Sequence, residues 1–211
     1  MKFQAKIIAF AVATMFAGAA FAQSGSQSKV NAQDLQQNQA GLLNKQEMDL
    51  GNASNGGKSN VTVKGVTQNQ AGLLNDQKVS IGNAAGKGSE SKVNATNIKQ
   101  NQAGLLNKQD LQIGNAANGG KSNVTAKDIT QNQAGLLNDQ SAKLGNATGK
   151  GSESKVNVQG VTQNQAGLLN KQALEVGNAA NGGKSDVTLK NATQNQAGLL
   201  NDQKMKVGNA Q

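Results

Sequence analysis

The segment that comes closest to a chemical motif is Asn52 to Ser59, which reads NASNGGKS. A phosphate-binding loop has the pattern GxxxxGK[ST], whose glycines let backbone N–H groups surround a phosphate. Here Asn52 occupies the place of the first glycine, and the segment recurs at 115–122 and 178–185 without the apolar strand and helix that a nucleotide site needs. It therefore predicts a turn and no cofactor.

Other catalytic and binding chemistry has no candidates either. The chain contains no His, Cys or Arg, and it has no paired carboxylates at a spacing that would hold them together in a cavity. General acid–base or nucleophilic catalysis, a metal site and specific nucleic-acid readout all depend on such groups. The place where calcium-binding repeats carry Asp holds Lys or Ser. We expect no enzyme activity, and only non-specific attraction between Lys side chains and anionic polymers.

Residues 1–22 have the three parts of a secretory signal peptide. Lys2 and Lys6 are the basic start, an apolar run extends from Ile7 to Phe21, and Ala20-Phe21-Ala22 provides the small residues of a cleavage site. The alternative is an N-terminal membrane anchor, which needs about 20 apolar residues. The leader predicts export through the periplasm and a mature chain that begins at Gln23 and has no transmembrane segment.

The mature chain lacks the side chains from which globular cores are usually built. All four Phe lie in the leader, and the rest of the chain has no aromatic residue. Without Lys2 and Lys6, 19 Lys face 12 Asp and Glu, which gives the mature chain a net charge of +7. Such a chain either stays disordered, as a polar linker array, or is ordered by repetition.

The octapeptide QNQAGLLN occurs six times, beginning at residues 37, 68, 100, 131, 163 and 194. The steps are alternately 31 and 32 residues, so the full unit is a 63-residue pair. Periods of this size indicate a solenoid or another repeat array. After a short segment at 23–29, the repeats are assigned to 30–60, 61–92, 93–123, 124–155, 156–186 and 187–211, with no capping repeat.

Each repeat reads as strands separated by turns. Apolar residues lie two apart at its start, as at Val61 and Val63, which is strand spacing. After QNQAG the alternation places Leu42, Asn44, Gln46, Met48 and Leu50 on one side. The Gly- and Asn-rich ends of the repeats supply positive φ. The sequence predicts an all-β fold, a β-solenoid of six coils with two or three strands each, stacked about 4.8 Å apart.

In such a stack identical residues lie above one another, so buried amides can bond from coil to coil. Two amide columns follow from this arrangement, and we call them the Gln39 ladder and the Asn44 ladder. Their members are Gln39, Gln70, Gln102, Gln133, Gln165 and Gln196, and Asn44, Asn75, Asn107, Asn138, Asn170 and Asn201.

Two columns of charge also favour an in-register parallel stack, in which alternating signs attract and like signs repel. The first, which we call the charge ladder, consists of Lys45, Asp76, Lys108, Asp139, Lys171 and Asp202. The second consists of Gln27, Lys58, Glu90, Lys121, Glu153 and Lys184.

The recurring pattern Gln-x-Gly-x-x-Asn, as in Gln39-Ala40-Gly41-Leu42-Leu43-Asn44, resembles the repeat of curlin, the subunit of bacterial curli fibres. This resemblance implies an exported amyloid subunit that polymerises at the cell surface into cross-β fibres of the biofilm matrix. It also implies that the Gln and Asn of the pattern form inward ladders. Partners implied by the resemblance are a secretion pore, a chaperone and a nucleator.

The sequence leaves two functions open. The first is a homopolymeric fibre for biofilm matrix and adhesion, which grows head to tail by coil stacking. The alternative is a monomeric secreted β-solenoid adhesin, whose flat face would bind a polysaccharide or another ordered surface.

Overall fold

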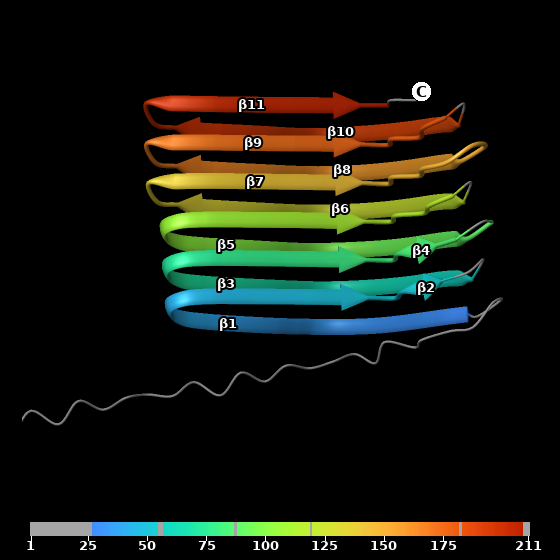
Figure 1. Cartoon of the computed structure of the whole chain (residues 1–211), viewed down its shortest axis with the longest axis horizontal. Coiled ribbons are helices and arrows are strands. Elements are labelled where there is room, and N and C mark those ends of the chain that lie inside the picture. Colours follow the sequence, from blue (N-terminus) through green and yellow to red (C-terminus); the bar gives the residue numbers. More distant parts are fainter. Residues whose placement is uncertain (1–26, 55–56, 87, 119, 182, 209–211) are drawn as a thin grey trace, which may run out of the picture.

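The computed structural model describes residues 27–54, 57–86, 88–118, 120–181 and 183–208, and these residues form six stacked coils (Figure 1). The signal peptide predicted at 1–22 and most of the segment predicted at 23–29 lie outside this part of the chain. The strands are β1 (Gln27–Leu50), β2 (Ala53–Ser54), β3 (Lys58–Ile81), β4 (Ala84–Ala85), β5 (Glu90–Ile113), β6 (Lys121–Ala134), β7 (Leu137–Leu144), β8 (Glu153–Ala166), β9 (Leu169–Val176), β10 (Lys184–Ala197) and β11 (Leu200–Val207).

All the strand pairs are parallel, and each residue lies beside its equivalent 31 or 32 positions away. The predicted all-β solenoid of six stacked coils is thereby confirmed. The coils begin at Gln27, Lys58, Glu90, Lys121, Glu153 and Lys184, three residues before the repeat boundaries assigned from the sequence.

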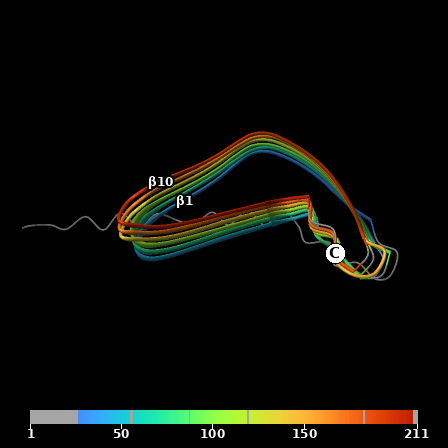
Figure 2. The same ribbon diagram turned by 90° about the horizontal axis from the view of Figure 1, so that it is seen from above.

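Each coil has two arms that meet at a narrow turn along one edge of the solenoid (Figure 2). We call residues 27–40 and their equivalents the long arm, and residues 43–50 and their equivalents the short arm. In the first three coils one 24-residue strand runs through the turn, and in the last three the arms are separate strands. On the loop side a small column of single bridges joins Ala84, Ala116, Ala147 and Ala179.

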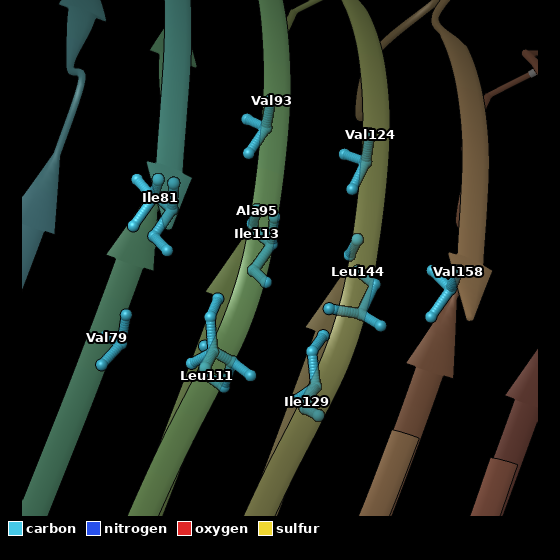
Figure 3. Close-up of a cluster of buried hydrophobic side chains, with 14 of the residues drawn as sticks. Val79, Ile81, Val93, Ala95, Leu111, Ile113, Val124, Ile129, Leu144 and Val158 are labelled. Carbon is cyan, nitrogen blue, oxygen red and sulfur yellow. The ribbon is translucent and has the colours of Figure 1, made fainter. Parts of the chain in front are cut away.

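The two arms enclose an interior with an apolar half and an amide half. Near the loops, Val61, Val63 and Val66 of the long arm pack with Val79 and Ile81 of the short arm, all fully or almost fully buried. Equivalent side chains of the neighbouring coils continue this core along the axis (Figure 3). Near the turn the inward side chains are Gln and Asn. The apolar half consists of Val, Ile, Leu, Ala and Met side chains and contains no aromatic residue, so backbone pairing and not aromatic burial orders the chain.

The turn corrects one expectation of the strand pattern. Asn44, Gln46, Met48 and Leu50 are buried as predicted, but Leu42 is 70% exposed. The reversal between the arms places both Leu42 and Leu43 on the outside, so inward alternation starts only at Asn44.

A bend in the long arm depends on a column of residues with positive φ. These residues are Asp34, Gly65, Asn97, Asp128, Gly160 and Asn191, with φ between 52° and 78°. The inward alternation shifts there, since two outward residues follow each other before inward residues resume. Gly, Asn and Asp are the residues that most easily adopt this left-handed conformation. The column therefore sets the bent cross-section seen in Figure 2.

Replacing Asn97 by Val should lower the free energy of unfolding by about 1–2 kcal/mol, because a β-branched residue is strained at φ 57°. Replacing Asn97 by Gly should leave stability nearly unchanged, since Gly is unstrained there. Denaturant unfolding of both variants checks this result. Equal stability of the Asn97→Val and Asn97→Gly variants would contradict the bend at this residue.

Candidate assembly surface: amide ladders, turn and charge columns

The Asn44 ladder is a continuous column of buried amides. Each Nδ2 donates to the Oδ1 of the Asn in the following coil at 2.8–2.9 Å, from Asn44 through to Asn201. The same Nδ2 also lies near the carbonyl oxygen of the Gly three residues earlier and near an Ala carbonyl of the next coil, as for Asn107 with Gly104 at 3.3 Å and Ala134 at 3.0 Å. The interior asparagines are thus bonded both along the axis and to the turn.

The Gln39 ladder runs in the opposite direction. Each Nε2 donates to the Oε1 of the preceding coil at 2.8–3.1 Å, from Gln70 to Gln39 and onward to Gln196 with Gln165. Each Gln of coils two to six also donates across the turn to the short arm, as Gln102 does to the Lys108 carbonyl at 2.8 Å. This column therefore fixes the distance between the two arms.

Four further amide columns were not assigned as ladders from the sequence. Two are buried and begin at Gln37 and Gln46, and two lie further out and begin at Asn38 and Asn52. Gln37 lies two residues before Gln39, so strand alternation alone was enough to predict it on the same side. The Gln46 column donates both to the preceding Gln and to a long-arm carbonyl, as Gln77 does to Asn101 at 3.3 Å.

One amide acceptor at the end of the Gln39 ladder has no hydrogen-bond partner in the described part of the chain. Gln196 Oε1 is buried and receives no hydrogen bond from the described residues. In the five preceding coils the equivalent oxygen accepts from the next Gln along the column. An unpaired buried acceptor is costly, about 1–3 kcal/mol.

Glycine is required at the turn by close approach between coils. A Cβ placed on Gly104 would lie 1.8 Å from the carbonyl oxygen of Gly72, and the glycines at 72, 135, 167 and 198 have the same contact with the coil before them. Gly41 differs, because no described coil precedes it, and its Cβ would meet only Asn44 Oδ1, at 3.2 Å.

The charge ladder lies in register on the outer face of the short arm. Lys45 is beside Asp76, Asp76 beside Lys108, and the alternation continues to Asp202 beside Lys171. Among the described residues none of these neighbours comes within the 4 Å of a direct ion pair. The column thus supplies alternating charge at strand spacing without fixed contacts.

The second charge column forms two direct pairs, Lys58 with Glu90 at 3.6 Å and Lys121 with Glu153 at 3.4 Å. Lys58 belongs to the segment that resembles a phosphate loop, and it opens β3 as an exposed residue. These pairs are well exposed, so each contributes little to stability, about 0–1 kcal/mol.

A further pair on the short arm joins Lys78 Nζ to Glu47 Oε1 at 2.9 Å. This hydrogen bond, followed by the positive charge of Lys78, lowers the pKa of the Glu47 carboxyl, and it also raises the pKa of Lys78. The carboxylate's contribution is present above its ordinary pKa and is lost as pH falls through the lowered value. The ammonium's contribution is lost as pH rises through the raised value. Both side chains are about two-fifths exposed, so the effect on stability is small.

No group of three or more His, Cys, Asp or Glu that could hold a metal occurs in the described part of the chain. Within the same residues no helix is long and apolar enough to cross a membrane. Comparison with family models, with curated proteins and with solved structures gives no match.

Proposed function

We propose that this protein is the structural subunit of an extracellular self-assembling fibre that grows head to tail by coil stacking. The observation that carries the proposal is the unpaired, buried Gln196 Oε1 at the end of a ladder whose other end offers a donor. Stacking the first coil of a second subunit on the sixth coil would let Gln39 Nε2 of that subunit donate to this oxygen.

The same stacking step would also continue the Asn44 ladder from one subunit to the next. Its amides donate toward the following coil. Among the described residues Asn201 Nδ2 therefore has no Asn acceptor and bonds only to the carbonyl of its own Gly198, at 3.3 Å, while Asn44 Oδ1 has no ladder donor. One stacking step would therefore continue both ladders at once. The exposed strand edges of the first and sixth coils would then be paired. Open strand edges favour uncontrolled aggregation, and pairing them in this register would give ordered growth.

The charge columns also favour this seam. The even number of coils would set Asp202 beside Lys45 of the next subunit, and Lys184 beside the neutral Gln27. The alternation found between the coils of one chain would thus continue across subunits without like charges in contact.

The remaining features of the proposal rest on the leader and on the likeness to curlin. The signal sequence supports export through the periplasm to the cell surface. The Gln-x-Gly-x-x-Asn pattern supports a curli-like functional amyloid for biofilm matrix and adhesion, with a secretion pore, a chaperone or a nucleator as partners.

A second function, a solenoid adhesin or surface-binding module, is favoured by the outer face of the long arm. Exposed lysines there alternate between two columns from coil to coil, at residues 29, 64, 92, 127, 155 and 190. Lys99 is also exposed on this face. If the second charge column is left out, the face has seven Lys and three Asp, and the three Asp are at 34, 128 and 186. Such a regular positive array suits an anionic polymer, and a fibre subunit could present it along the whole fibre.

Replacing Asp202 by Lys should slow the elongation of preformed seeds about two- to fivefold at low salt, because it would set two lysines together at the seam. Elongation should recover at high salt as screening shortens the Debye length, and on adding Lys45→Asp. Fibres of the parent chain should give a reflection near about 4.8 Å.

Asp139→Lys is the matched control for this seam test. It places a new Lys between Lys108 and Lys171 within one chain but changes no seam residue. If Asp202→Lys elongates no more slowly than Asp139→Lys, subunits do not join through these coils. A parent chain that stays monomeric with strong β signal would count against the fibre and in favour of the adhesin.

A further inference from the structure

The two outer faces of the solenoid differ in charge. The long-arm face has the net positive charge described above. The short-arm face, formed by residues 45, 47 and 49 and their equivalents in the other coils, has seven Lys and seven Asp or Glu, and is neutral. A neutral face with evenly distributed charges of both signs is suited to pairing with another such face.

A row of exposed leucines borders this neutral face along the turn edge. The row comprises Leu43, Leu74, Leu106, Leu137, Leu169 and Leu200, which are 40% to 74% exposed. An apolar groove runs along the axis between this row and the charge ladder. Contiguous exposed apolar surface of this kind marks an interaction site.

We propose that two copies of this chain pair laterally through their short-arm faces, antiparallel, about a two-fold axis parallel to the strands. This pairing goes beyond head-to-tail growth and does not depend on it. The symmetry sets coil one against coil six, coil two against coil five and coil three against coil four. The leucine row of one copy then packs on the leucine row of the other.

The charge ladder indicates that the partner of the short-arm face is a second copy of this chain in the antiparallel orientation. Because the signs alternate over an even number of coils, every member meets an opposite charge: Lys45 meets Asp202, Asp76 meets Lys171, and Lys108 meets Asp139. Complementary charge of this kind fixes the register of an interface.

The two neighbouring columns of the short-arm face, which begin at Glu47 and Asp49, also avoid contacts between like charges. Glu47 meets Lys204 and Asp49 meets Lys206, and the other positions of these two columns set a charged residue against a neutral one. No like charges meet in the three columns of the described face. A parallel pair with the leucine rows in contact would instead place the two charge ladders on opposite sides of that contact, where they could not pair.

The size of the face is sufficient for specific association. Seven residues of strand by six coils measure about 23 by 29 Å, or about 650 Å² per copy, from strand dimensions. Two copies would bury about 1,300 Å² together, which lies within the range of specific interfaces.

Site-directed cross-linking tests the pair. Lys78 and Ala173 lie in the same column, in coils two and five, so the antiparallel pair sets them opposite each other. A head-to-tail seam instead leaves them three coils apart, about 14 Å, a separation that the control pair below shares. Chains with Lys78→Cys and chains with Ala173→Cys would be mixed and treated with a bis-maleimide that reaches about the 10 Å between packed sheets. The mixture should give at least tenfold more cross-linked dimer than either chain alone.

The control pair is Lys64→Cys with Gln159→Cys, which occupy the equivalent coils on the long-arm face and are exposed. It should give only background, with the β signal of all four variants unchanged. Adding Leu74→Ser and Leu169→Ser to the test chains should abolish the cross-link. The proposal is overturned if Lys78→Cys cross-links equally well alone, if the control pair matches the test pair, if no dimer forms, or if the serine variants still cross-link.

Discussion

Replacing Asn107 by Leu is expected to lower the free energy of unfolding by about 2–4 kcal/mol, whereas Asn94→Leu in the same coil should change it by less than about 0.5 kcal/mol. Asn107 is 4% exposed, donates to Asn138 Oδ1 at 2.9 Å and accepts from Asn75 Nδ2 at 2.8 Å. Leu would leave the Asn138 oxygen without its ladder donor, and the Asn75 amide with carbonyl partners only.

Comparing Asn107→Leu with Asn94→Leu separates the effect of burial from the effect of residue type, because both variants replace Asn by Leu within the same strand of coil three. Asn94 is exposed on the outer face of the long arm. Denaturant unfolding followed by β signal provides the measurement. If the two variants were equally stable, the Asn44 ladder would not be an interior column.

Replacing Gly104 by Ala should destabilise the solenoid by about 4 kcal/mol or more, while Gly41→Ala should cost less than about 1 kcal/mol. The methyl group on residue 104 would lie 1.8 Å from the Gly72 carbonyl oxygen, so the backbone of the turn must move. Among the described residues, the methyl group on residue 41 meets only Asn44 Oδ1, at 3.2 Å. Thermal unfolding of the two variants measures the difference.

Equal stability of these two alanine variants would show that the coils do not approach each other at the turn as described. The effect at residue 104 does not arise from backbone conformation, because Gly104 has no positive φ among the described glycines. It arises from the coil beneath it.

The period of the repeat was sufficient to predict the register of the stack, and strand alternation was sufficient for most inward residues. The bend was missed because Asp34, Gly65 and Asn97 differ in type and share only their tolerance of positive φ. Leu42 was predicted to point inward because strand alternation was continued through the turn. In the structure the turn exposes two successive residues, Leu42 and Leu43, and so interrupts the alternation.

The direction of the ladders could not be read from the sequence. An amide side chain can present its oxygen or its nitrogen to either neighbour, so residue type leaves the polarity open. In the structure the Gln39 ladder donates toward the preceding coil and the Asn44 ladder toward the following coil. Because each ladder keeps one direction throughout, one of its ends offers a donor and the other an acceptor. The first and sixth coils are therefore complementary, which is the basis of the proposed head-to-tail growth.

Seeded elongation with Gly41→Ala tests that growth most directly. Within one chain the new methyl group has no described coil beneath it. At a seam it would meet the carbonyl oxygen of Gly198 of the preceding subunit, just as a Cβ on Gly198 would lie 1.7 Å from the Gly167 oxygen. The variant should therefore fold with parent-like stability, fail to form fibres by itself, and stop parent seeds from growing at the end it occupies. Elongation of Gly41→Ala at the parent rate would contradict head-to-tail coil stacking.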